Sequence, residues 1–214
     1  MKEMRERRSR AEVVRDLREV FRRFGYEGAT LTRIAEQTGL GRASLYHHFP
    51  NGKDEMLHAV FEQTEYAFDE QILSRLRGDL PPQERLRDVL EHLWEHYKGG
   101  STTCFVALLA LTCNEGELGP GIQRIFQKWV AAFAGVIEES GVGVEEAQLR
   151  AEDAVLRIQG ALVLTRALND PGPFERVMMM LSETLLARER SEPVSRAAAP
   201  RLLSKRSTVA HARQ

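Results

Sequence analysis

Hydrophobic residues recur at intervals of three and four along most of the chain, and this period dictates a helical protein. The pattern is clearest in residues 13–24 and 122–137, where each stretch carries one continuous apolar stripe. An α-helix brings side chains with this spacing onto one face, whereas a half-buried strand requires a period of two. No run with a period of two is found, and no Asn-Gly or Asp-Gly pair joins two such runs. The sequence therefore predicts an all-α fold.

Glycine and proline divide the helical pattern into segments, because both residues end helices. Nine helices are predicted, at about residues 13–24, 32–38, 42–49, 54–76, 86–97, 104–113, 122–137, 145–168 and 174–187. We expect an N-terminal module in residues 1–53 and a larger helical domain in residues 54–189. Residues 190–214 lack periodicity and are predicted to form a disordered basic tail.

Charge is distributed unevenly along the 214 residues, although the net charge is only −1. Residues 1–53 hold 12 Lys and Arg against 7 Asp and Glu, whereas residues 54–187 hold 11 against 22. A basic N-terminal module on an acidic body indicates that one end of the molecule meets a polyanion. Chance segregation of solvated surface charge is the alternative.

Membrane and secretory signals are missing from the sequence. No apolar run approaches the roughly 18 residues that would span a bilayer, and the charged start of the chain lacks the apolar stretch of a secretory signal. We therefore expect a cytoplasmic protein with no membrane partner.

Two short helices joined by a tight turn at residues 39–41, inside the basic segment, indicate a helix-turn-helix. At about 100° per residue, Leu45 and Phe49 of the second helix point into the module. The opposite face carries small or hydrogen-bonding side chains, which are Ala43, Ser44 and His47. Such a face can enter a DNA major groove, which is roughly 12 Å wide. Arg42 and Tyr46 lie on its flanks.

The residues from Leu31 to Leu57, LTRIAEQTGLGRASLYHHFPNGKDEML, resemble the DNA-binding signature of the TetR family of bacterial regulators. The preceding residues 24–26, FGY, fit that signature as well. Residues 104–110 (CFVALLA) and 159–162 (QGAL) resemble the LmrA/YxaF-type branch of the family. The resemblance implies an all-helical homodimer whose N-terminal module reads a palindromic double-stranded operator and whose larger domain binds a small effector.

The same resemblance implies a role for individual residues of the N-terminal module. It implies that phosphate is contacted by Thr32, Arg33, Tyr46, His47 and Lys53, and that bases are faced by Arg42, Ala43 and Ser44. The sequence departs from the family at Gly41, where a Ser or Thr cap is common, and at Gly52, an extra residue before Lys53. An ordinary surface histidine is the alternative for His47 and for His48.

Residues 92–96, His-Leu-Trp-Glu-His, match the pattern of inverted zinc peptidases. His92 and His96 are four residues apart, so one ion could bridge them. However, His92 falls on the polar face of its helix and no third ligand is recognisable. We expect surface or boundary histidines and no metal or other cofactor. A metal-dependent hydrolase that uses His92, Glu95 and His96 is the alternative, although no other catalytic signature favours an enzyme.

Aromatic side chains gather on the apolar faces of three body helices. Each of them alone is best explained as core, but the resemblance favours an apolar cavity for a small apolar or aromatic effector. The expected lining residues are Trp94, Tyr97, Cys104, Phe105, Phe126, Trp129 and Phe133.

The last two helices are apolar over most of their circumference, and a surface helix needs only one apolar stripe. We expect a homodimer through a four-helix interface, with a fully internal helix as the alternative. Together these features predict an effector-responsive transcriptional repressor. An activator or a general DNA-binding protein without an effector is the other possibility.

Overall fold

The computed structural model describes residues 8–113 and 116–187, and within these residues every regular element is a helix. The elements in chain order are α1 (Arg10–Gly28), α2 (Leu31–Thr38), α3 (Arg42–His48), α4 (Lys53–Phe68), the π-helix η1 (Asp69–Leu73), α5 (Ser74–Leu76), α6 (Pro82–His96), α7 (Phe105–Thr112), α8 (Gly119–Glu139), α9 (Val144–Leu168) and α10 (Gly172–Thr184). The predicted all-α fold is confirmed. The expected basic tail at residues 190–214 lies outside the described residues.

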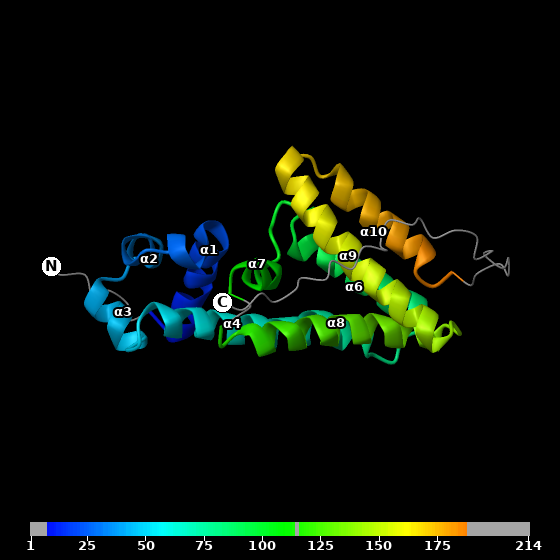
Figure 1. The fold of residues 1–214 in the computed structure, drawn as a ribbon, viewed down its shortest axis with the longest axis horizontal. Coiled ribbons are helices and arrows are strands. Elements are labelled where there is room, and N and C mark those ends of the chain that lie inside the picture. The colour runs from blue at the N-terminus through cyan, green and yellow to red at the C-terminus, as the bar shows by residue number, and fades with distance from the viewer. Residues whose placement is uncertain (1–7, 114–115, 188–214) are drawn as a thin grey trace, which may run out of the picture.

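Helices α1, α2 and α3 form a small head at one end of the molecule, and α4 runs from this head into the larger body (Figure 1). Ser9 caps α1 in a reciprocal pair of hydrogen bonds with Glu12. The inward stripe of α1 is buried, as the spacing predicts, from Val13 to Phe21. Gly25 has a φ of 66°, so the regular helix ends there as expected, and a short turn follows to Gly28.

Helix α4, η1 and α5 together form a rod that leads from the head into the body. This rod is less regular than the single helix predicted for residues 54–76. Its backbone stays right-handed throughout, but residues 69–73 form the wider π-helix η1 between α4 and α5. Lys128 of α8 binds Asp69 at 2.8 Å, which fastens the start of η1 to the body. Isolated π-turns inside α-helices often occur at functional sites.

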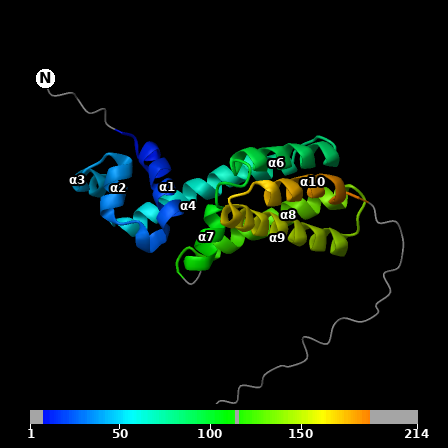
Figure 2. The ribbon, with the colours of Figure 1, turned by 90° about the horizontal axis from the view of Figure 1, so that it is seen from above.

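The body is a bundle in which α8 packs along α9, while α10 packs against both α9 and α6 (Figure 2). Small side chains make close packing possible: Ala147, Ala151 and Ala154 of α9 are completely buried. Arg85 of α6 is also buried, and it donates a 2.7 Å hydrogen bond to the carbonyl oxygen of Leu76 and pairs with Glu139 of α8. This arginine therefore ties the end of the rod to the bundle. None of the helices described is long and apolar enough to cross a membrane.

Candidate nucleic-acid interface and ligand cavity

Helix α3 presents its polar face to solvent. Leu45 and Phe49 are fully buried against the rest of the head, as the angular spacing predicts. The side chains expected to face DNA are all exposed, namely Arg42, Ala43, Ser44, Tyr46 and His47. The turn before α3 depends on Gly39, whose φ of 67° closes α2 in the left-handed conformation. The head therefore offers one short, exposed helix with small side chains in the middle of its outer face.

Helix α2 packs against α3. Its N-cap is Thr30, whose hydroxyl accepts a hydrogen bond from the backbone of Arg33. Thr32 is exposed at the first turn of the helix. The guanidinium of Arg33 donates a 2.7 Å hydrogen bond to the carbonyl oxygen of Gly28 and lies 4.4 Å from the centre of the Phe24 ring. Arg33 is therefore exposed but already attached to the end of α1.

Lys53 begins α4 and is held in place by Tyr26. Its ammonium donates a hydrogen bond to the Tyr26 carbonyl oxygen and lies over the Tyr26 ring. An ammonium has three donors, so this single bond leaves two for another acceptor. The preceding Gly52 has a φ of 72°, a conformation that glycine adopts without strain. The extra residue in this loop thus has a conformational reason.

Helix α3 itself begins without a side-chain cap. Its N-cap is Gly41, which supplies no hydrogen bond to the exposed N–H groups of the first turn. Unpaired N–H groups at a helix start carry a partial positive charge and favour an anion.

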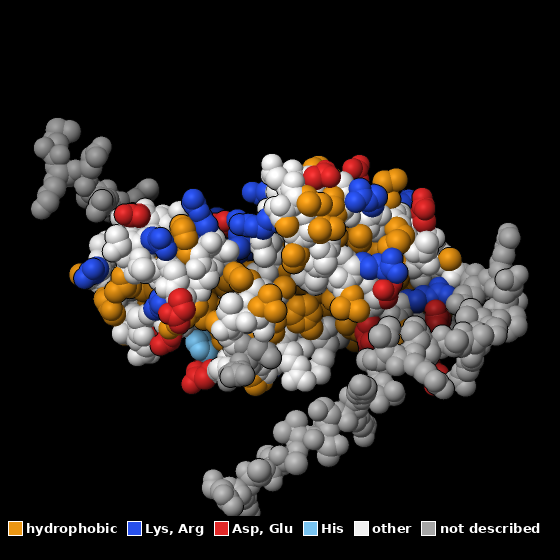
Figure 3. Space-filling model, turned by 45° about the horizontal axis from the view of Figure 1, so that its top comes forward, with side chains coloured by type: hydrophobic (Ala, Val, Ile, Leu, Met, Phe, Trp, Pro, Cys, Tyr) orange, Lys and Arg blue, Asp and Glu red, His pale blue; other side chains and the backbone are white. Residues whose placement is uncertain are grey.

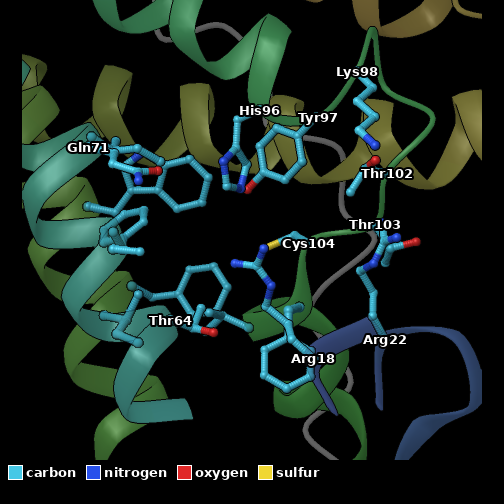
Figure 4. A pocket seen from close by; sticks show the side chains of 18 of the residues that line it. Arg18, Arg22, Thr64, Gln71, His96, Tyr97, Lys98, Thr102, Thr103 and Cys104 are labelled. Atoms are coloured by element: carbon cyan, nitrogen blue, oxygen red, sulfur yellow. The ribbon is translucent and has the colours of Figure 1, made fainter. Parts of the chain in front are cut away.

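A cavity of about 200 Å³ lies where the head meets the body. Its walls come from α1, from α4 and η1, from residues 96–106, and from α8 (Figure 4). Five of the residues expected around an effector line it, which are Tyr97, Cys104, Phe105, Phe126 and Trp129. Trp129 is 1% exposed and its ring packs edge-on against Phe68, so it forms a rigid part of the apolar wall.

Trp94 and Phe133 do not line this cavity. Trp94 stacks on Phe174 of α10, with ring centres 5.7 Å apart, because the loop after α6 folds back beneath its indole at Gly99. Phe133 is fully buried among the body helices, one turn farther along α8 than Trp129. Both residues therefore lie outside this cavity, and their place beside an effector stays a prediction.

Polar residues of the cavity include several that the sequence pattern did not single out. Arg18 and Arg22 reach it from α1 of the head, and Gln71 reaches it from η1 (Figure 4). The apolar stripe of α1 identified its buried side but gave no sign that its other side faces the body. These arginines make the cavity more cationic than the expected apolar pocket.

His96 and Tyr97 form the upper wall of the cavity in Figure 4. Burial, followed by the charge of Arg18, lowers the pKa of His96 to about 4, so its imidazole is neutral at pH 7. His96 lines the cavity, and its side chain remains exposed there. Burial also raises the pKa of Tyr97 well above its usual value, which keeps the phenol neutral. The wall thus offers uncharged polar groups.

The histidines of the zinc-peptidase pattern meet no third ligand among the described residues. His92 and His96 have ring centres 6.2 Å apart. Within the described parts of the chain, no three His, Cys, Asp or Glu side chains lie close enough together to hold a metal ion. His96 belongs to the wall of the cavity, while the Nε2 atom of His92 is buried without a hydrogen-bond partner among those residues.

Apolar side chains remain exposed on α9 and α10. They are Val144, Leu149, Leu156, Val163, Leu164, Leu168 and Met179. Figure 3 shows hydrophobic side chains clustered over this part of the body. Leu149, Leu156 and Val163 are spaced seven residues apart, so they form a stripe along α9. A face of this kind is typical of an interface rather than of a solvated surface.

In the three-helix head, α2 and the exposed helix α3 are joined by a tight turn. This arrangement is a helix-turn-helix, the element of a DNA-binding regulator. Residues 15–60 match the model of the tetR family of bacterial regulatory proteins, and residues 82–180 match the C-terminal domain of LmrA/YxaF-like transcriptional regulators. The chain belongs to the TetR family, with a body of the LmrA/YxaF type.

Individual relatives agree with this assignment. The HTH-type transcriptional regulator YxaF of Bacillus subtilis is 22% identical over 77% of this chain and 88% of its own length. The HTH-type transcriptional repressor AcnR of Corynebacterium glutamicum is 33% identical over 36% of this chain and 43% of its own. A TetR regulator from Legionella pneumophila has the same fold, with a TM-score of 0.72 at 19% identity over 85% of this chain and 99% of its own.

Proposed function

We propose that this protein is a cytoplasmic repressor that binds a palindromic operator as a homodimer and leaves it when a small ligand enters the cavity. The exposed face of α3 is the observation that carries the proposal, since its small and hydrogen-bonding side chains suit a major groove. The name of AcnR, a repressor that is 33% identical over 36% of this chain, supports repression over activation. In this proposal residues 1–53 read DNA, and residues 54–189 bind the ligand and the second subunit.

The proposed contacts with DNA are of two kinds. Contacts with phosphate position the protein on the duplex, and contacts with bases read its sequence. Lys53 and Tyr46 contact phosphate. Arg33 and Thr32 approach the backbone from α2, with Arg33 first leaving its contact with Gly28. His47 adds a further backbone contact. Base edges are faced by Arg42, Ala43 and Ser44, because these side chains lie at the exposed start of α3.

The symmetry of the dimer determines the symmetry of the operator that it can bind. In this proposal the exposed stripe of α9, which includes Leu156 and Val163, packs with α10 against the same face of a second copy. A two-fold dimer carries two α3 helices. They must meet major grooves about 34–36 Å apart, or a multiple of that distance. The operator is therefore expected to be an inverted repeat.

Ligand response follows from the place of the cavity. Its walls include α1 of the head and α4, the rod that joins head to body. A ligand can weaken DNA binding only if it prefers a conformation in which the two heads are wrongly spaced. A coupling free energy of about 1–3 kcal/mol would change the affinity for DNA some 5- to 150-fold.

The test is a titration of the purified protein against mixed-sequence duplex DNA at several salt concentrations. Binding should weaken steeply as salt rises, because phosphate contacts release counterions. A combined Arg42→Ala and Lys53→Ala variant should bind at least tenfold more weakly, whereas Arg87→Ala, at an exposed site on the body, should not. Binding without salt dependence, or an unaffected double variant, would contradict the proposed interface.

A further inference from the structure

Arg18 reaches the cavity as a cation, and no described residue serves as its counter-ion. Its side chain rises from α1 toward Cys104 and the wall formed by His96 and Tyr97 (Figure 4). It is half-buried, and among residues 8–113 and 116–187 its guanidinium forms no hydrogen bond or ion pair. A half-buried arginine usually pairs with a carboxylate or a carbonyl oxygen, because removing its charge from water is costly.

The other charges around the cavity do not neutralise Arg18. Arg22 pairs with Glu19, the single acidic side chain among the described residues that line the cavity. Lys98 adds a further positive charge. His96 contributes none, because burial, followed by the charge of Arg18, lowers its pKa and keeps its imidazole neutral. The cavity therefore holds a net positive charge beside an aromatic wall.

We propose that the cavity binds a small organic anion, with its carboxylate paired to Arg18 and its apolar body packed against Phe126 and Trp129. This inference rests on the ligand-responsive function proposed above and names the chemical class of the ligand. The planar guanidinium donates two parallel hydrogen bonds, which match a carboxylate. Phe126 and Trp129 both line the cavity, with ring centres 6.2 Å apart, and they supply an apolar part of its wall.

Such a ligand joins the two parts of the protein directly. Arg18 belongs to the head, whereas Trp129 belongs to α8 of the body. A carboxylate held by Arg18 and an apolar group held by Trp129 fix the distance between these two elements. The bound anion therefore favours one position of α1 relative to the body. Helix α3 moves with α1, because both helices pack in the same core of the head.

The experiment compares two matched pairs of probes, 2-naphthoate with 2-naphthamide and octanoate with octanamide, by calorimetric titration of the full chain. At least one acid should bind tenfold or more tightly than its neutral amide. Arg18→Gln should abolish that preference, and Arg18→Lys should retain part of it. Arg15→Gln is the matched control: it removes the same charge from an exposed site of α1 outside the cavity and should leave the preference intact.

Equal binding of acid and amide in both pairs, or no binding of either acid at millimolar concentration, would overturn the proposal. A preference that survives in Arg18→Gln would also overturn it. Circular dichroism of each variant shows that the fold is retained. The proposed regulatory function is tested separately by binding to DNA without probe, so its failure is distinguishable: a chain that binds DNA but not the acids contradicts only the ligand class.

Discussion

The Lys53 ammonium donates a 3.1 Å hydrogen bond to the carbonyl oxygen of Tyr26 and lies 4.1 Å from the centre of the Tyr26 ring. The hydroxyl of the same tyrosine donates to Asp54, and this bond is the main cause that raises the pKa of Tyr26 to about 12. One side chain at the end of α1 therefore holds the first two residues of α4. These contacts set the orientation of the DNA-binding head relative to α4, which leads to the cavity.

Lys53→Ala should weaken binding to every duplex by a similar factor, because the lysine is proposed to contact phosphate and no base. The slope of log affinity against log salt should flatten by roughly one unit for each half-site. Binding titrations at several salt concentrations measure both quantities, with Arg87→Ala on the body as the charge-matched control. A change in sequence preference without a change in slope would show that Lys53 has been assigned the wrong role.

Arg42→Ala should lose discrimination between sequences. If Arg42 donates two hydrogen bonds to a guanine edge, its loss should cost about 1–3 kcal/mol per site and relax one operator position in each half. Titration against an operator and a scrambled duplex separates this effect from general weakening. Equal weakening of both duplexes would remove Arg42 as a base reader and leave Ser44 and His47 as the candidates.

Leu156→Glu should convert the dimer to a monomer, because it places a charge in the middle of the apolar stripe on α9, where Leu156 is 70% exposed in the single chain. Its affinity for the operator should fall as the second head is lost. Light scattering at micromolar concentration measures the mass. Leu80→Glu, in the exposed turn before α6, is the control and should remain dimeric. A dimeric Leu156→Glu variant would contradict the proposed interface.

The stability of the folded chain should decrease as the pH falls from about 6.5 to about 4. His96 has a folded pKa near 4, while an unfolded histidine titrates near 6.5, so the unfolded state binds more protons in this window. Above pH 7 the histidine contributes no pH dependence, since it is neutral in both states. Urea unfolding across this range should show a weaker decrease in His96→Gln. An identical pH profile for parent and variant would refute the assignment.

The sequence predicted the head better than the cavity. The faces of α3 follow from helical geometry alone, so the inward direction of Leu45 and Phe49 could be calculated. Arg18 could not be assigned in this way, since its place in the cavity depends on how α1 packs against the body. The same holds for Trp94 and Trp129, which lie on similar apolar stripes. Only the fold of the loop after α6 separates them, by turning Trp94 toward Phe174.

The π-helix at residues 69–73 also escaped prediction, because its residues favour an α-helix equally well. Its position is set by packing against the body, where Lys128 binds Asp69.

The decisive experiment is selection of duplexes from a random pool by the purified protein, followed by sequencing. We expect an enriched inverted repeat, with half-sites centred one helical turn or a multiple of it apart, because two α3 helices related by a two-fold axis must read it. Enrichment of a single asymmetric motif, or no enrichment at all, would contradict the claim that this chain is a dimeric reader of a palindromic operator.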